Sequence, residues 1–205
     1  MNTRVISGAE PGAIQQALQI LRAGELVAFP TDTVYGLGAL FDDSRSIEQL
    51  YRVKGRESAK AIPILLSSVA ELPRMAAHID ERVQRLAQHF WPGPLTLVVP
   101  RHPALPDILS PYPTVGVRVP DHPLALELLL HAGPLATTSA NLSNQPSATT
   151  AREVLQHLDG RIALILDGGE TPGGVSSTVV DCSGVDLIIL RQGPLTMEML
   201  LSALS

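Results

Sequence analysis

Apolar residues recur at helical spacing in the first part of the chain, and a short apolar run follows them. A helix is predicted from near Pro11 to Gly24, because proline favours the first turn of a helix and glycine its end. The residues that share the apolar face of this helix are Ile14, Ala17, Leu18 and Leu21. The run at residues 26–30 then predicts a buried strand.

The same alternation continues to the end of the chain. Ser44 is predicted to cap a second helix, which delivers Lys54 and Arg56 at its C-terminal end. Further helices are predicted at residues 69–77, 80–90, 123–131, 149–158 and 196–204. Further strands are predicted at residues 62–66, 95–99, 115–119, 135–138, 162–166, 178–180 and 187–190. A rigid turn at 91–94 and a proline-rich loop at 100–113 interrupt the pattern.

This order of elements predicts an α/β fold. No shift in composition marks a linker, and the strand at residues 115–119 needs the earlier sheet to bury both of its faces. We therefore expect a single domain over residues 1–205, with a twisted mixed sheet flanked by helices.

Three hydroxyl side chains and two glycines follow the strand at residues 26–30. The hydroxyls belong to Thr31, Thr33 and Tyr35, and Gly36 and Gly38 would let the backbone approach a ligand or adopt positive φ. A polar turn after a buried strand is a common way for an α/β sheet to build a site at its edge. The alternative is a turn with a purely structural role.

Composition and charge limit the possible partners. Hydrophobic residues make up 45% of the chain and charged residues 17%, which indicates a globular protein with a sizeable core. The net charge of −5 disfavours broad affinity for nucleic acid. Against this background Arg52, Lys54, Arg56 and Lys60 form a basic cluster that contains one acid, Glu57. The cluster indicates either a solvated helix end or a site for a small anion such as a nucleotide.

The sequence also indicates the cellular compartment. No apolar stretch approaches the roughly 18 residues that span a bilayer, and the N-terminus leads into no apolar signal segment. The single cysteine, Cys182, excludes an internal disulfide, and we expect it to be buried in a reducing compartment. A cytoplasmic protein without membrane contact is therefore predicted.

Several common chemistries have no motif in the chain. The phosphate-binding Gly-x-x-x-x-Gly-Lys-Ser/Thr pattern is missing, and the glycines at 36 and 38 lack the third glycine of a dinucleotide site. The six histidines show no spacing typical of metal ligands, so no protein-held metal is expected. No pattern indicates a covalent nucleophile, and Asp42 and Asp43 fit a solvated loop better than a catalytic pair.

The remaining polar motifs resemble a known family. Lys54-Gly55-Arg56 followed by Ser139-Ala140-Asn141 resembles the Lys-x-Arg and Ser-x-Asn signature of the YrdC-like threonylcarbamoyl-AMP synthases. The likeness covers nearly the whole chain and is closest to the short bacterial type without an extra C-terminal domain. It extends through residues 29–38, 90–97, 117–120, 176–181 and 190–193.

The resemblance implies an enzyme, a nucleotidyltransferase that joins L-threonine, bicarbonate or CO₂, and ATP with Mg²⁺ into threonylcarbamoyl-AMP and pyrophosphate. Other proteins then transfer the threonylcarbamoyl group to adenosine 37 of tRNA, and a weak tRNA contact with this chain is an open question. Lys54 and Arg56 would neutralise charge during catalysis. The positions implied to hold nucleotide are Lys54, Arg56, Lys60, Thr114, Ser139, Asn141, Ser147 and Arg191. The positions implied to hold threonine are Thr33, Arg118, Thr137 and Ser177.

Two residues depart from the family pattern. Glu57 replaces a usual proline and adds a negative charge beside the expected phosphate site, and Leu65 replaces a histidine of the longer members. Three alternatives remain: a carbamoyl-adenylate module of hydrogenase maturation, an RNA-binding or ribosome-assembly factor, and an inactive paralogue. The aromatic content of 3% and the negative net charge disfavour the RNA-binding alternative.

Overall fold

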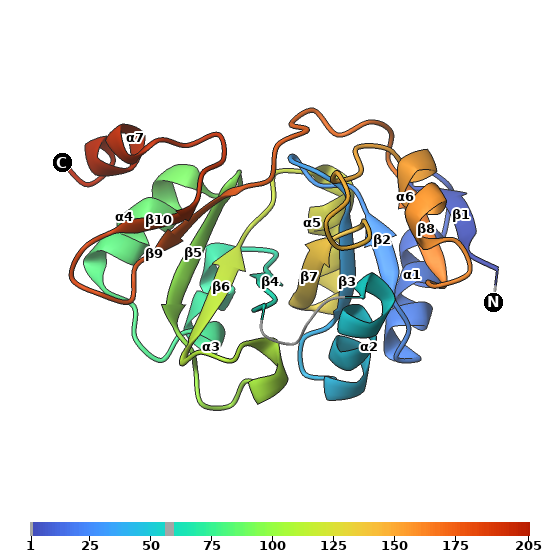
Figure 1. The fold of residues 1–205 in the computed structure, drawn as a ribbon, viewed down its shortest axis with the longest axis horizontal. Coiled ribbons are helices and arrows are strands. Elements are labelled where there is room, and N and C mark those ends of the chain that lie inside the picture. Colours follow the sequence, from blue (N-terminus) through green and yellow to red (C-terminus); the bar gives the residue numbers. More distant parts are fainter. Residues whose placement is uncertain (1, 56–59) are drawn as a thin grey trace.

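The computed structural model describes residues 2–55 and 60–205. Within these residues ten strands form one mixed sheet in the order β1-β8-β2-β3-β7-β4-β6-β5-β9-β10. The sheet runs across the molecule, with β1 and β8 near the N-terminus and β9 and β10 near the C-terminus (Figure 1). The strands are β1 (Arg4–Ser7), β2 (Val27–Phe29), β3 (Gly36–Leu40), β4 (Ile64–Leu65), β5 (Leu95–Pro100), β6 (Thr114–Arg118), β7 (Leu135–Ser139), β8 (Leu164–Asp167), β9 (Thr178–Asp181) and β10 (Ile188–Arg191).

The predicted α/β class with a mixed sheet is confirmed, and the helices flank the sheet as expected. The helices are α1 (Ala13–Arg22), α2 (Ser44–Lys54), α3 (Leu72–Met75), α4 (Glu81–Phe90), α5 (Pro123–Ala132), α6 (Ala151–Leu158) and α7 (Met197–Ser202), with short 3₁₀ helices η1 (Val69–Glu71) and η2 (Asp107–Leu109). That the domain extends over all of residues 1–205 stays a prediction. Among the described helices, none is both long and apolar enough to cross a membrane.

Successive residues of the strands pack on opposite faces of the sheet, as the pleat of a strand requires. Val27 and Phe29 of β2 pack with α1 and α5, whereas Ala28 packs on the other face. In the same way Leu65 of β4 joins the cluster around α1 and α5, and Ile64 joins the opposite one. The helices whose buried apolar residues contribute to that opposite cluster include α2, α3, α4, α6 and α7.

Helices cover one face of the sheet more completely than the other, and the candidate site lies on the less covered face. Leu97 of β5 and Val117 of β6 are fully buried in the cluster that contains α3 and α4. The other face of the same strands carries Thr96, Val98 and Arg118, which line a cavity instead of packing under a helix. Because α1 and α5 pack on β2, β4, β7 and β8, they leave this end of the sheet for polar side chains.

Two local predictions need correction. The predicted cap at Ser44 is wrong: Asp43 caps α2, and its carboxylate accepts a hydrogen bond of 3.0 Å from the amide of Arg45. The single helix predicted over residues 69–77 is divided into η1 and the four residues of α3. Pro73 lies in the first turn of α3, where its missing amide proton costs no intrahelical bond.

The strand β3 was not predicted, because its two glycines were interpreted as a turn. A Cβ atom on Gly38 would lie 2.8 Å from the ring of Phe29, and one on Gly36 would lie 2.8 Å from Cγ2 of Thr137. The glycines therefore let neighbouring side chains pack across β3, which pairs antiparallel with β2 and with β7. The turn is at residues 30–35, and it carries Thr31 and Thr33 of the candidate site.

Candidate active site

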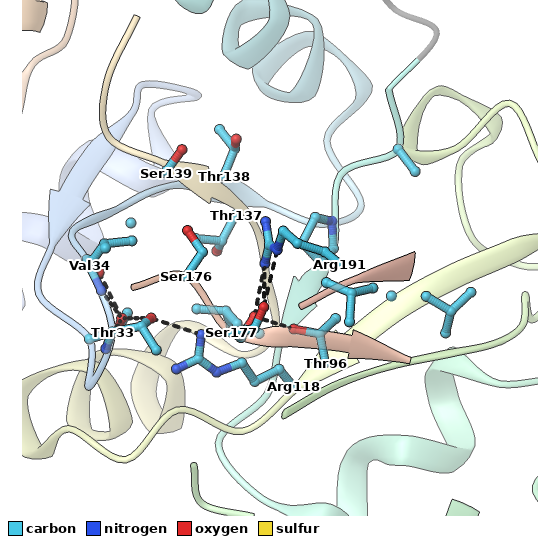
Figure 2. A pocket seen from close by; sticks show the side chains of 18 of the residues that line it. Thr33, Val34, Thr96, Arg118, Thr137, Thr138, Ser139, Ser176, Ser177 and Arg191 are labelled. Atoms are coloured by element: carbon cyan, nitrogen blue, oxygen red, sulfur yellow. Dashed lines mark hydrogen bonds between the residues drawn. The ribbon is translucent and has the colours of Figure 1, made fainter. Parts of the chain in front are cut away.

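A cavity of about 320 Å³ lies on the open face of the sheet. Its walls come from the turn between β2 and β3, from β7, and from the strands β5, β6, β9 and β10. Figure 2 shows polar side chains from these separate segments pointing toward the same space. The polar residues that line it include Thr31, Thr33, Thr96, Thr114, Arg118, Thr137, Thr138, Ser139, Ser176, Ser177 and Arg191.

The structure brings most of the predicted site residues together. All four positions implied to hold threonine line this cavity: Thr33, Arg118, Thr137 and Ser177. Three of the positions implied to hold nucleotide also line it: Thr114, Ser139 and Arg191. Arg56 and Glu57 lie outside the described residues. The roles of these positions stay predictions.

Arg118 is the most constrained charged group of the cavity. Alternation along β6 predicts that it points away from Val117, and the structure buries it to 5% exposure. Its Nε donates to the carbonyl of Gly93 at 2.9 Å, and its Nη1 donates to Oγ1 of Thr33 at 3.0 Å. Its Nη2 forms an ion pair with Asp32. A long cation in a strand is usually a surface residue, and the structure shows that this one is buried.

Burial and two charged neighbours shift the pKa of Arg118. Burial lowers the pKa of its guanidinium, Asp32 raises this pKa, and the nearby Arg191 lowers it again. Because the ordinary pKa of arginine lies above 12, the side chain stays protonated at neutral pH. The cavity therefore presents a buried cation, which suits an anionic group such as a carboxylate.

The hydroxyl of Thr33 is fixed in direction by Thr31. Oγ1 of Thr31 donates to the carbonyl of Val34 at 2.7 Å, and it lies 3.0 Å from Oγ1 of Thr33. Because the single proton of Thr31 is used on Val34, Thr33 donates to Thr31 and accepts from Arg118. Thr33 can therefore offer a lone pair to a ligand, and its own proton is already in use.

Thr137 has the same polarity on the opposite wall. Its hydroxyl donates to the carbonyl of Leu135 at 3.0 Å, so only acceptor capacity remains. This end of the cavity thus combines guanidinium donors with hydroxyl acceptors. This pattern matches a zwitterion, whose carboxylate accepts and whose ammonium and hydroxyl groups donate.

Ser177 connects the cavity to the edge of the sheet. Nε and Nη2 of Arg191 donate to its carbonyl at 3.1 and 3.0 Å, and Nη2 also donates to its Oγ at 3.0 Å. On the other side, Oγ of Ser177 lies 2.8 Å from Oγ1 of Thr96 (Figure 2). Thr96 was missed in the sequence, although it is the polar position between the buried apolar residues Leu95 and Leu97.

An irregularity in β10 brings Arg191 to the cavity. Ile189 pairs with Val180 and Arg191 pairs with Val179, so Leu190 has no partner in the register. Such a bulge changes the direction of side chains, and here both Leu190 and Arg191 line the cavity. The sequence Leu190-Arg191 alone contains no signal for the bulge.

Lys54 and Asn141 shape the loop that follows β7. Lys54 is only 4% exposed, and its Nζ donates to the carbonyls of Ser139 and of Asn141, the latter at 2.7 Å. The side-chain amide of Asn141 donates to Leu142 at 3.0 Å and to Gln145 at 2.7 Å. Neither residue is among the described residues that line the cavity. Their geometry supports positioning of Ser139, and a direct nucleotide contact stays a prediction.

The last two predicted positions lie away from the cavity wall. Lys60 is exposed and Ser147 is half-buried, and neither belongs to the described lining. The lining also contains the apolar residues Ala61, Pro63, Val98, Val179 and Leu190. An apolar wall next to cationic and hydroxyl groups suits a ligand that has both a flat ring and charged substituents.

Fold and cavity together define an α/β protein with a candidate site for a small, charged organic ligand on the open face of a mixed sheet. The family model described as "Telomere recombination" (Sua5, YciO and YrdC) matches residues 19–193. The chain belongs to this family.

Curated relatives carry one recurring name. The threonylcarbamoyl-AMP synthase of Bacillus subtilis is 44% identical over 90% of this chain and 54% of its own length. A putative threonylcarbamoyl-AMP synthase of Mycobacterium tuberculosis is 37% identical over 90% of this chain and 86% of its own. The chain therefore spans about half the length of the first relative and most of the second.

A solved structure of a relative has the same fold. Sua5 of Pyrococcus abyssi in complex with L-threonine superposes with a TM-score of 0.95 at 40% identity. The match covers 98% of this chain and 61% of that protein. The likeness thus covers nearly the whole chain.

Proposed function

We propose that this chain is an L-threonylcarbamoyladenylate synthase, a nucleotidyltransferase that forms threonylcarbamoyl-AMP and pyrophosphate. Its substrates would be L-threonine, bicarbonate or CO₂, and ATP. The observation that carries the proposal is the buried Arg118 beside the acceptor hydroxyls of Thr33 and Thr137. The name of the relatives and the threonine bound in the P. abyssi protein support it.

The amino acid would lie at the polar end of the cavity. Its carboxylate would bind the guanidinium of Arg118, and its hydrogen-bond donors would meet Thr33 and Thr137. Ser177, held by Arg191 and Thr96, would close the other side of this pocket. A site that hydrogen-bonds a substrate hydroxyl discriminates strongly against an analogue without one.

The nucleotide would lie along Thr114, Ser139 and Arg191, with its base toward the apolar lining. Lys54, Arg56, Lys60, Asn141 and Ser147 are the further positions that we propose for this part. Lys54 and Asn141 would act at least through the loop they hold, which carries Ser139. Mg²⁺ would enter on the phosphates of ATP and neutralise charge there.

The reaction requires no protein nucleophile. The threonine amine adds to CO₂ and loses a proton, which gives a carbamate. A carbamate oxygen then attacks the α-phosphorus of ATP, and the bond to pyrophosphate breaks. Such a transfer depends mainly on alignment and charge stabilisation, which fixed arginines and hydroxyls can supply.

The product would serve N6-threonylcarbamoyladenosine formation at position 37 of tRNA. We propose that separate threonylcarbamoyl-transferase proteins consume it, that any tRNA contact with this chain is weak, and that the reaction occurs in the cytoplasm. The burial of the Cys182 thiol at 4% exposure is compatible with a reducing compartment.

The decisive experiment incubates the purified protein with ATP, Mg²⁺, L-threonine and bicarbonate, and follows pyrophosphate. We expect release only when threonine and bicarbonate are both present, and threonylcarbamoyl-AMP should be detected by mass spectrometry. Pyrophosphate release at the same rate with and without threonine would contradict the proposal. No release, together with binding of threonine and ATP, would favour the inactive paralogue.

A further inference from the structure

Asp32 lies directly behind the amino-acid end of the cavity. It occupies the turn between Thr31 and Thr33, both of which line the cavity, but Asp32 is not among the described lining residues. Its side chain is 12% exposed, and that of its ion-pair partner Arg118 is 7% exposed. Arg118 therefore lines the cavity, whereas Asp32 holds Arg118 from outside the described lining.

The contacts of Asp32 are specific. Its Oδ1 accepts from Nη2 of Arg118 and, at 3.0 Å, from the backbone amide of Asp121. The hydrogen bond from Asp121 connects the carboxylate to the segment that follows β6, the strand that carries Arg118. Asp32 therefore has a fixed position relative to the guanidinium.

The donors of Arg118 can be counted. A guanidinium has five N–H groups. Within the part of the chain that the structure describes, three are used: Nε donates to Gly93, Nη1 to Thr33 and Nη2 to Asp32. On that part of the chain one further N–H on Nη1 and one on Nη2 remain for a ligand, and a carboxylate can accept from both; this pair of N–H groups is called the fork.

We infer that Asp32 is a positioning residue: it orients the guanidinium of Arg118 so that this fork faces the carboxylate of the amino-acid substrate. The inference rests on the proposed function. Asp32 also offsets the repulsion between Arg118 and Arg191, two cations that line the same cavity. Without Asp32, Arg118 would keep only Gly93 and Thr33 among these three acceptors.

A purely structural ion pair is the competing explanation. Buried ion pairs are weak evidence for stability, and removing one partner leaves an uncompensated charge. A structural role predicts loss of folding, with equal effects on both substrates. A positioning role predicts a selective loss of threonine binding, because ATP does not use the fork.

The test compares Asp32→Asn with the wild type by calorimetric titration of L-threonine and, separately, of ATP. Asparagine keeps the size of the side chain and an acceptor oxygen but removes the charge. We expect threonine affinity to fall by about 10- to 100-fold, because a misoriented ligand group can cost a factor of this order. ATP affinity should change less than about threefold, which on the free-energy scale is about half of a factor of ten.

Asp121→Asn is the matched control. Asp121 lies in the segment that follows β6, and its side chain is exposed. The substitution leaves its backbone amide, which donates to Asp32, unchanged. We expect wild-type affinity for both ligands. If Asp121→Asn weakens threonine binding as much as Asp32→Asn, general charge near the cavity explains the effect and the inference fails.

A second measurement covers the case in which Asp32→Asn folds poorly. In an Arg118→Lys background the fork is absent, so Asp32→Glu should have little further effect on threonine affinity. In the wild-type background Asp32→Glu should weaken threonine binding several-fold, because the longer side chain displaces the guanidinium. Equal effects in both backgrounds would overturn the inference.

The possible outcomes distinguish a failure of the proposed function from a failure of the role inferred for Asp32. If the wild-type protein binds ATP but no threonine, the proposed function fails, and the inference about Asp32 fails with it. If the wild type binds threonine and Asp32→Asn binds it equally well, only the inference fails. Parallel loss of threonine and ATP binding, with a lowered melting temperature, would assign Asp32 a structural role.

Discussion

The hydroxyl of Thr31 accepts the proton of Thr33 across 3.0 Å because its own proton is bound to the carbonyl of Val34 at 2.7 Å. Thr31 and Val34 thus fix the direction in which the hydroxyl of Thr33 donates its hydrogen bond. Thr31 is only 3% exposed, so its effect on a ligand passes mainly through Thr33.

Replacing Thr31 by valine tests this relationship. Valine keeps the shape but removes the acceptor, so the Thr33 proton can turn toward Arg118 or the ligand, where it repels donors. We expect the KM for threonine to rise about tenfold, which corresponds to about 1.4 kcal/mol. The KM for ATP should stay nearly constant. Thr31→Ser retains the hydroxyl and should behave like the wild type; equal defects in both variants would contradict the explanation.

Threonine should be strongly preferred over valine as a substrate. Valine has the same shape but lacks the hydroxyl, and a site that binds this hydroxyl would leave its own polar groups unpaired. We expect the kcat/KM for pyrophosphate release to fall by at least about 100-fold with valine. Comparable rates with both amino acids would exclude a threonine site in this cavity.

Lys54 should contribute to stability as well as to activity. Its sequence position predicts an exposed cation at a helix end, whose loss costs only a few tenths of a kcal/mol. The structure instead buries it against the carbonyls of Ser139 and Asn141. Lys54→Met should therefore lower the free energy of unfolding by about 2–4 kcal/mol, because buried acceptors lose their donor.

Chemical denaturation measures this effect, and Arg52→Met provides the control. Arg52 lies on the same helix, and its side chain is 75% exposed in its pair with Glu48. We expect a change below about 0.5 kcal/mol for this exposed residue. If Lys54→Met is as stable as Arg52→Met, the lysine does not hold the loop after β7, and a direct phosphate contact becomes the better explanation.

His122 should make stability depend on pH. Burial lowers the pKa of its imidazole, an effect that Asp32 and Asp121 partly oppose. Because the folded pKa lies below the ordinary value of 6.5, the unfolded state takes up the proton first as the pH falls. Stability should therefore be lost below about pH 6.5, down to the folded pKa.

Thermal melts of the wild type and His122→Asn between pH 8 and pH 5 check this direction. Other groups also titrate in this range, so the difference between the two proteins is the relevant quantity. The wild type should lose more stability than the variant on acidification. Parallel curves would show that His122 does not contribute.

The fold class followed from the sequence because hydrophobic periodicity reports which face of an element is buried. Strand β3 escaped prediction because Gly36 and Gly38 carry no side chain to show a period, and their purpose depends on Phe29 and Thr137 in other strands. Arg118 was correctly placed opposite Val117, but its burial depends on walls that local sequence does not encode.

The site was predicted mainly through family motifs. Thr96 and Asp32 were not identified as site residues, because their importance comes from hydrogen bonds to Ser177 and Arg118. Thr31 was identified only as part of a polar turn, and its hydrogen bond to Thr33 was not predicted. The burial of Lys54 was missed for a similar reason: its carbonyl partners lie more than eighty residues away along the chain.

The narrow strand β4 has a mechanical consequence. It joins the two halves of the sheet through only two residue pairs on each side, with β7 on one side and β6 on the other. Thr137 belongs to the first half, whereas Arg118 and Ser177 belong to the second. A ligand held between them would connect the two halves of the sheet across a junction of only two residue pairs. If threonine binds there, it should stabilise the folded protein, and saturating threonine should raise the melting temperature.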